Sequence, residues 1–266
     1  MVFGFLKKRR RARLRAAPVP LAWRAIVERT VPIFAHLSPS DQGELLGHVH
    51  VLLDEKHFEG CGGLELTDEI RVTIAAQACL LLLHRETDYY PRLRSILVYP
   101  SGYTVHEERA IGDGLWEESG EDLLGHTEEH LSALVLAWDS ARHGATEAGD
   151  GENLVLHEFA HQLDFEDSST DGTPMLASRA EYLAWARVMG EEFEALRLAE
   201  ASGRRTVIDQ YGAENPAEFF AVVTEAFFER PHALRRRHPE LYERLARFYQ
   251  QDPAVFVPET RGGTAR

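Results

Sequence analysis

The sequence has few cysteines, no long apolar run and no repeats. Its two cysteines form no CxxC pair and cannot make a disulfide framework, so we expect a reducing cytoplasm. The longest apolar run, residues 70–83, is interrupted by polar side chains and is too short to span a bilayer. Internal repeats and long low-complexity segments are also absent. These absences leave a globular protein, and its hydrophobic content of 44% supports a sizeable core.

Basic residues are scarce and unevenly placed. The chain has 29 Lys and Arg against 43 Asp and Glu, and the net charge of −14 argues against direct nucleic-acid binding. Seven of the basic residues gather between Lys7 and Arg15, after a short apolar start. Such a basic tail could contact anionic lipid or an acidic partner, although a short basic run is more often a solvated end. We predict a basic flexible tail over 1–19, one domain over 20–257 with an N-terminal helical layer, and a flexible tail over 258–266. No apolar core follows the basic run, which excludes a signal peptide.

The pattern of apolar residues predicts a mostly helical α+β protein. Helical spacing and capping residues indicate helices at 23–34, 40–53, 70–83, 153–163, 178–199, 216–228 and 239–250. Short apolar runs predict strands at 95–99 and 132–138. We expect residues 112–129 to form a loop or weak hairpin, and residues 141–151 a connecting loop. The small sheet then lies next to the helix at 153–163.

That helix contains the pentapeptide HExxH, from His157 to His161. Residues four apart lie on the same face of a helix, so both imidazoles can reach one metal ion. Imidazole nitrogens suit Zn²⁺, which lowers the pKa of its bound water to about 7. Glu158 is then placed to take a proton from that water as it attacks a peptide carbonyl. The motif predicts a zinc-dependent peptidase.

HExxH alone is only moderately specific in a chain with 13 His. The apolar residues around it predict a buried helix, in which two His and a Glu need a partner such as a metal. A second pair, His126 and His130, lacks a Glu after its first His and lies in a polar stretch. We expect no metal site there.

A catalytic zinc takes three protein ligands, and the third is not evident from HExxH. Asp167 falls where the longer HExxHxxGxxH motif places a third His, but Asp164 replaces the Gly of that motif, so this choice fits poorly. Glu218 is the stronger candidate, on a helix expected to be buried. However, Glu218 also follows Asn215 by three residues, as in a capping box. Spacing alone leaves ligation and capping both open.

Three segments resemble the Mlc titration factor A family of glucose-regulated, zinc-dependent bacterial peptidases. They are HEFAHQLD at 157–164, the NPAEFFAV segment after Tyr211, and FYQQDP at 248–253. The resemblance covers roughly residues 20–257. It implies one Zn²⁺ per chain, held by His157, His161 and Glu218, with Glu158 as general base.

The second segment also resembles the catalytic domain of anthrax lethal factor. The resemblance implies that Tyr211 supports the transition state, where a phenol donor would stabilise the developing oxyanion. Lethal factor has a further Glu where this chain has Val222, and the nearest acid here is Glu225, which could act behind the ligands. Asp164 could accept a ring N–H from a ligand histidine, or could simply end the helix.

Strands next to a HExxH helix suit a zincin-like α+β fold. The resemblance implies a metallopeptidase that hydrolyses peptides, with aminopeptidase-like action, in the cytoplasm that the cysteine content predicts. An aminopeptidase needs an acidic pocket for the free amino terminus, and the sequence does not reveal one. The alternative function is a non-catalytic regulator that sequesters an Mlc-like transcriptional repressor of sugar-uptake genes. The two roles are compatible. A purely structural zinc is disfavoured, because such sites usually have four protein ligands.

Overall fold

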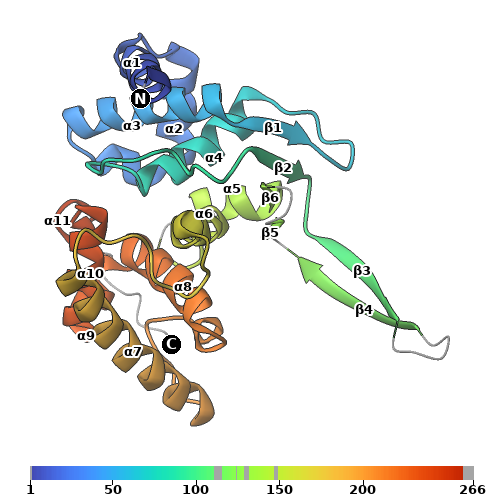
Figure 1. Cartoon of the computed structure of the whole chain (residues 1–266), viewed down its shortest axis with the longest axis vertical. Helices are drawn as coiled ribbons and strands as arrows, with labels where there is room; N and C mark the ends of the chain where they lie inside the picture. The colour runs from blue at the N-terminus through green and yellow to red at the C-terminus, as the bar shows by residue number, and fades with distance from the viewer. Residues whose placement is uncertain (1, 111–115, 124, 129–131, 147–148, 260–266) are drawn as a thin grey trace.

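The computed structural model describes residues 2–110, 116–123, 125–128, 132–146 and 149–259 (Figure 1). The helices are α1 (Val2–Ala16), α2 (Leu21–Thr30), α3 (Pro39–Glu55), α4 (Asp68–Leu80), α5 (Trp138–Thr146), α6 (Leu154–Asp164), α7 (Arg179–Ala201), α8 (Pro216–Glu229), α9 (Pro231–Arg237), α10 (Pro239–Tyr249) and α11 (Pro253–Phe256). Short 3₁₀ helices are η1 (Pro32–His36), η3 (Phe165–Asp167) and η4 (Gln210–Ala213). The strands are β1 (His57–Gly60), β2 (Ser95–Tyr99), β3 (Tyr103–Ala110), β4 (Trp116–Leu123), β5 (Gly125–Glu128) and β6 (Ala133–Ala137).

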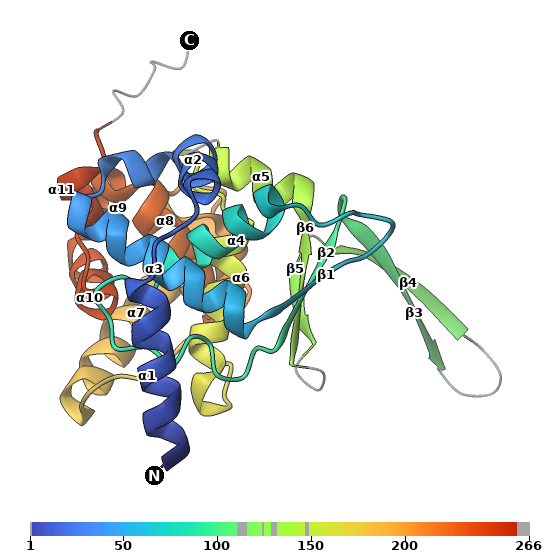
Figure 2. The ribbon, with the colours of Figure 1, turned by 90° about the horizontal axis from the view of Figure 1, so that it is seen from above.

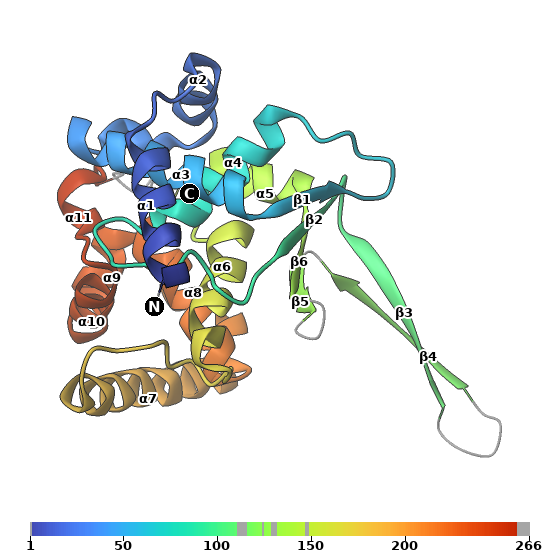
Figure 3. The same ribbon diagram turned by 45° about the horizontal axis from the view of Figure 1, so that its top comes forward.

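A small sheet lies beside the helices, with its strands in the order β1-β2-β6-β5 (Figures 1 and 2). The first three strands are parallel, and β5 is antiparallel to β6 and forms one edge. Every residue of β6 is buried, as expected for a strand covered on both faces. Strands β3 and β4 form a separate hairpin that projects from the body (Figure 3). These elements confirm a mostly helical α+β architecture, whereas its zincin-like character stays a prediction.

Helix α6 lies between two buried helices. It packs against α4 on one side and α8 on the other, and α8 is buried along almost its whole length. Asn153 caps α6 by accepting a hydrogen bond from the backbone N–H of Leu156, at 3.0 Å. Asn215 caps α8 in the same way, through the N–H of Glu218. The two caps fix where each helix begins, and therefore which side chains face each other between them.

The predicted tail at 1–19 differs from the structure, because Val2–Ala16 form helix α1. The Arg11 side chain is only 7% exposed and pairs with Glu55 of α3 at 2.7 Å and with Asp88 at 2.5 Å. A buried guanidinium needs such partners, which lie far away in the sequence and give no local signal. The division into one domain with flanking tails otherwise stays a prediction.

Several shorter segments also differ from expectation. The loop predicted at 141–151 instead contains most of α5, whose small residues Ala141, Gly144 and Ala145 are buried. The predicted loop or weak hairpin at 112–129 contains β4 and β5. His126 therefore lies on a strand, while His130 is outside the described residues. Among the helices of the described ranges, none is long and apolar enough to cross a bilayer.

Candidate metal centre

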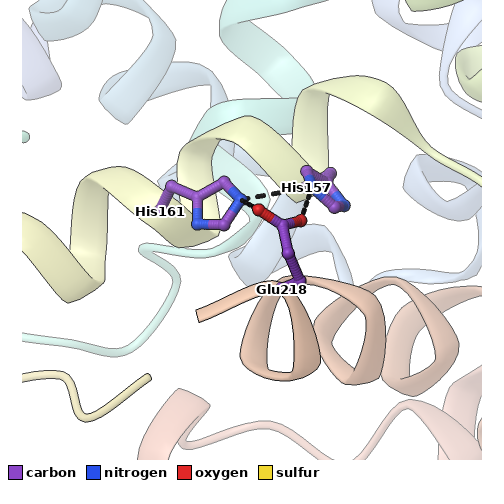
Figure 4. A group of neighbouring side chains, drawn as sticks. All are labelled: His157, His161 and Glu218. Atoms are coloured by element: carbon purple, nitrogen blue, oxygen red, sulfur yellow. Dashed lines mark hydrogen bonds and ion pairs between the residues drawn. The ribbon is translucent and has the colours of Figure 1, made fainter. Parts of the chain in front are cut away.

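Helices α6 and α8 bring two imidazoles and one carboxylate together (Figure 4). His157 and His161 project from successive turns of α6, and Glu218 reaches them from the first turn of α8. The two Nε2 atoms lie 3.2 Å apart. Glu218 Oε2 lies 3.0 Å from His157 Nε2, and Oε1 lies 3.5 Å from His161 Nε2. The structure thus groups all three residues that the resemblance implied as ligands.

The donor set fits a zinc ion. Two atoms that each lie 2.0–2.1 Å from a tetrahedral zinc are about 3.3 Å apart, and the three separations here bracket that value. These side chains are less than one-fifth exposed, at 13%, 17% and 17% for His157, His161 and Glu218. Lone pairs held this close together in a half-buried site repel one another unless a proton or a metal cation lies between them. The carboxylate of Glu218 faces the histidines, so capping of α8 by Asn215 leaves this carboxylate available as a ligand.

Glu225 lies directly behind the first histidine. Its Oε1 is 2.8 Å from His157 Nδ1, and its Oε2 accepts a hydrogen bond from the backbone N–H of Asn153. An acceptor at Nδ1 keeps the proton there and leaves Nε2 free to bind a metal. The sequence suggests that Glu225, two helical turns after Glu218, could act behind the ligands. The structure shows that Glu225 contacts His157.

The electrostatics of the cluster favour positive charge. Burial would lower the pKa of His157, but the hydrogen bonds to Glu218 and Glu225 outweigh it and raise the pKa to about 10. Burial would raise the pKa of Glu218, but the two histidines lower it to about 2. The site therefore keeps an ionised carboxylate and stabilises a cation beside it.

Glu158 and Tyr211 line a cleft next to this cluster. Glu158 is 5% exposed, whereas Tyr211 on η4 is 54% exposed. The Tyr211 ring centroid lies 6.0 Å from that of His157, at an interplanar angle of 39°. η4 is fixed by Asp209, whose carboxylate accepts a hydrogen bond from the Tyr211 N–H at 2.8 Å. Glu158 and the Tyr211 phenol therefore line the same cavity as His157.

The cleft has a volume of about 740 Å³ and is rich in carboxylates. Besides Glu158 and Glu225, its lining includes Asp139, Glu152 and Asp209. These three come from separate segments, which is why the sequence shows no acidic pocket. Together they make the cleft attractive to a positively charged group.

The other candidates are not part of the cluster. Asp164 Oδ2 accepts the backbone N–H of Gly172 at 2.8 Å, and burial raises the pKa of Asp164 to about 6. Asp164 Oδ1 is buried and lacks a partner among the described residues. The Asp167 carboxylate accepts hydrogen bonds from the backbone N–H and the hydroxyl of Ser169. Asp164 thus holds the turn at Gly172. This position requires glycine, because its φ is +76° and the backbone oxygen of Pro216 would clash with any added Cβ.

Comparisons with known proteins identify the family of this chain and several relatives. The family model described as glucose-regulated metallo-peptidase M90 matches residues 6–250. The chain is similar to an uncharacterized protein of Synechocystis, at 39% identity over 90% of this chain and 86% of that protein. It is similar to Mlc titration factor A of Klebsiella pneumoniae, at 32% identity over 86% of each chain. The Mlc titration factor A of Yersinia pestis is 30% identical over 84% of this chain and 82% of its own.

Proposed function

The chain belongs to the family of glucose-regulated metallopeptidases M90, and on this premise we propose that it is a zinc-dependent peptidase. The zinc ligands are His157, His161 and Glu218, and Glu158 is the general base. One observation carries the proposal: two imidazole nitrogens and a carboxylate converge within 3.0–3.5 Å beside a buried glutamate. Three protein ligands leave one zinc position for the reaction, unlike a closed structural site.

The residues then have distinct roles. A zinc ion in this site would polarise the peptide carbonyl and lower the pKa of a water molecule. Glu158 takes the proton from the attacking water and returns it to the amine that leaves when the C–N bond breaks. Tyr211 donates its phenol hydrogen to the carbonyl oxygen as negative charge develops there. Glu225 orients the His157 ring through Nδ1.

The cleft supports aminopeptidase action. A substrate with a free amino terminus carries an ammonium group, and Asp139, Glu152 and Asp209 supply carboxylates in the same cleft as the base. The peptide backbone could pair with β5, an edge strand of the sheet, by main-chain hydrogen bonds. Both features favour a short extended peptide whose amino terminus lies in the acidic cleft.

A pair of substrates tests this assignment. We expect an alanyl anilide with a free amine to have kcat/KM about 10- to 100-fold above that of its N-acetylated form, since hydrogen bonds to charged groups contribute about 1.5–3 kcal/mol. The comparison is initial-rate hydrolysis of each by the zinc-loaded protein. Asp139→Asn should bring the kcat/KM values of the free-amine and the N-acetylated substrate closer together. Equal rates of the wild-type protein on both substrates would indicate endopeptidase action instead.

The relatives' names favour a second role. Proteins called Mlc titration factor A share about a third of their residues with this chain across most of its length. We propose that this chain also binds an Mlc-like transcriptional repressor, which would place it in the cytoplasm. Such binding needs a protein surface rather than turnover, so it can coexist with the peptidase or act without it.

A further inference from the structure

A second group of metal-binding side chains lies outside the catalytic cleft. Asp41 and Glu44 lie three residues apart on the first turns of α3, so both face the same side of the helix. His84 reaches them from the segment after α4, and Gln250 lies just beyond the end of α10. The group therefore connects three elements that are distant in the sequence.

The hydrogen bonds of His84 fix the orientation of its ring. Nδ1 lies 3.0 Å from the backbone oxygen of Gln250. A carbonyl oxygen can only accept, so Nδ1 carries the hydrogen. Nε2 then faces two carboxylates, with Asp41 Oδ1 at 2.9 Å and Glu44 Oε2 at 4.0 Å. Metal-binding histidines are oriented in this way, with the second ring nitrogen donating to a backbone carbonyl or a carboxylate.

We propose that Asp41, Glu44 and His84 form a second binding site for a divalent transition-metal ion such as Zn²⁺. The three ligand atoms all lie within 4.8 Å of one another. The two Nε2–carboxylate separations lie on either side of the roughly 3.3 Å expected around a tetrahedral zinc. One imidazole with two carboxylates suits zinc better than Ca²⁺ or Mg²⁺, which prefer oxygen ligands alone.

The backbone around the site supports the carboxylates. Glu44 Oε1 accepts the backbone N–H of His84 at 2.8 Å and lies 3.3 Å from Nε2 of His48. This leaves Oε2 as the oxygen that faces the site. The side chains of Asp41, Glu44 and His84 are 27%, 34% and 38% exposed, so the group is open to solvent. A bound ion would join α3 to the segment after α4, while the backbone oxygen of Gln250 holds the His84 ring from its other side.

A proton on His84 is the competing explanation. With Nε2 protonated, His84 and Asp41 form an ordinary ion pair. Burial would lower the pKa of His84, but the bonds to Asp41 and Gln250 raise it. A proton and a metal ion would occupy the same position between the ring and the carboxylates. Zinc content therefore separates the two explanations.

The experiment measures zinc per chain in two variants after equilibrium dialysis against micromolar Zn²⁺. His161→Ala weakens the catalytic site, and the second variant adds His84→Gln. We expect His161→Ala to keep one zinc more than the double variant, and its melting temperature to rise on zinc addition while that of the double variant does not. The control adds His57→Gln to His161→Ala, at an exposed histidine on β1. It should change neither the zinc content nor the effect of zinc on the melting temperature.

Equal zinc content in the two variants would overturn the second site and leave the His84–Asp41 ion pair. If His84→Gln does not fold, Asp41→Asn replaces it, since the amide keeps the size of the side chain but is a poor metal ligand. The readout uses no peptidase activity. Failure of this site and failure of the proposed catalytic function are therefore distinguishable.

Discussion

Glu158→Gln should reduce peptide hydrolysis about 10²- to 10⁴-fold while leaving the zinc content at the wild-type level. The loss is the range typical of a missing general base. The zinc should stay, because the ligands His157, His161 and Glu218 are unchanged and Gln has nearly the same volume as Glu. Since Glu158 is buried at 5% exposure, the isosteric change also avoids a cavity. Anilide hydrolysis and metal analysis on one preparation measure both results.

The matched control is a Glu→Gln substitution at an exposed position far from the site in the sequence. Glu200→Gln, at an exposed position on α7, should leave both turnover and zinc content unchanged. Near-normal turnover in Glu158→Gln would contradict the mechanism. Zinc in both proteins with turnover in neither would point to the repressor-binding role, or to an enzyme that needs its partner.

Glu218→Ala should lower zinc affinity by more than about 100-fold. Loss of a residue that only supports a ligand costs about 10- to 100-fold, and a direct ligand should cost more. The carboxylate oxygens lie 3.0 Å and 3.5 Å from the two histidine nitrogens, so their removal leaves only two ligands. Competition with a chromophoric chelator measures the affinity. Turnover should fall in parallel with zinc occupancy.

Asn215→Ala separates ligation from capping. It removes the side chain that caps α8 without altering the carboxylate, and should cost about 0.5–2 kcal/mol of folding free energy. Its zinc affinity should stay close to that of the wild type. If Glu218→Ala kept its zinc and lost only a similar amount of stability, Glu218 would be a capping residue and not a ligand.

The sequence predicts the parts of the site that depend on local spacing. His157 and His161 are one turn apart on any helix, so HExxH determines their relation and the position of Glu158. The sequence also predicts α8, from Asn215 and Pro216 at its start. The approach of Glu218 to the histidines, however, depends on the packing of α8 against α6, which no spacing within either segment reveals.

Other features depend on long-range contacts and were missed for that reason. The acidic cleft combines Asp139, Glu152 and Asp209 from three segments. Helix α1 packs against α3 and contains Arg11, whose acidic partners lie 44 and 77 residues further along the chain. Strand β1 has only four residues, whose side chains alternate between exposed and half-buried. It is extended because it pairs with β2, and this partner is not evident from the sequence of β1 itself. The spacing of residues within one segment does not predict contacts with residues in distant segments.

The central claim is that this chain hydrolyses peptides with a zinc ion held between α6 and α8. The most direct measurement is anilide hydrolysis by the wild-type protein after removal of metal by a chelator, followed by titration with Zn²⁺. We predict that the metal-free protein is inactive and that activity returns as zinc refills the site, while Glu218→Ala regains none at the same zinc concentration. Full turnover by the metal-free protein would contradict the account.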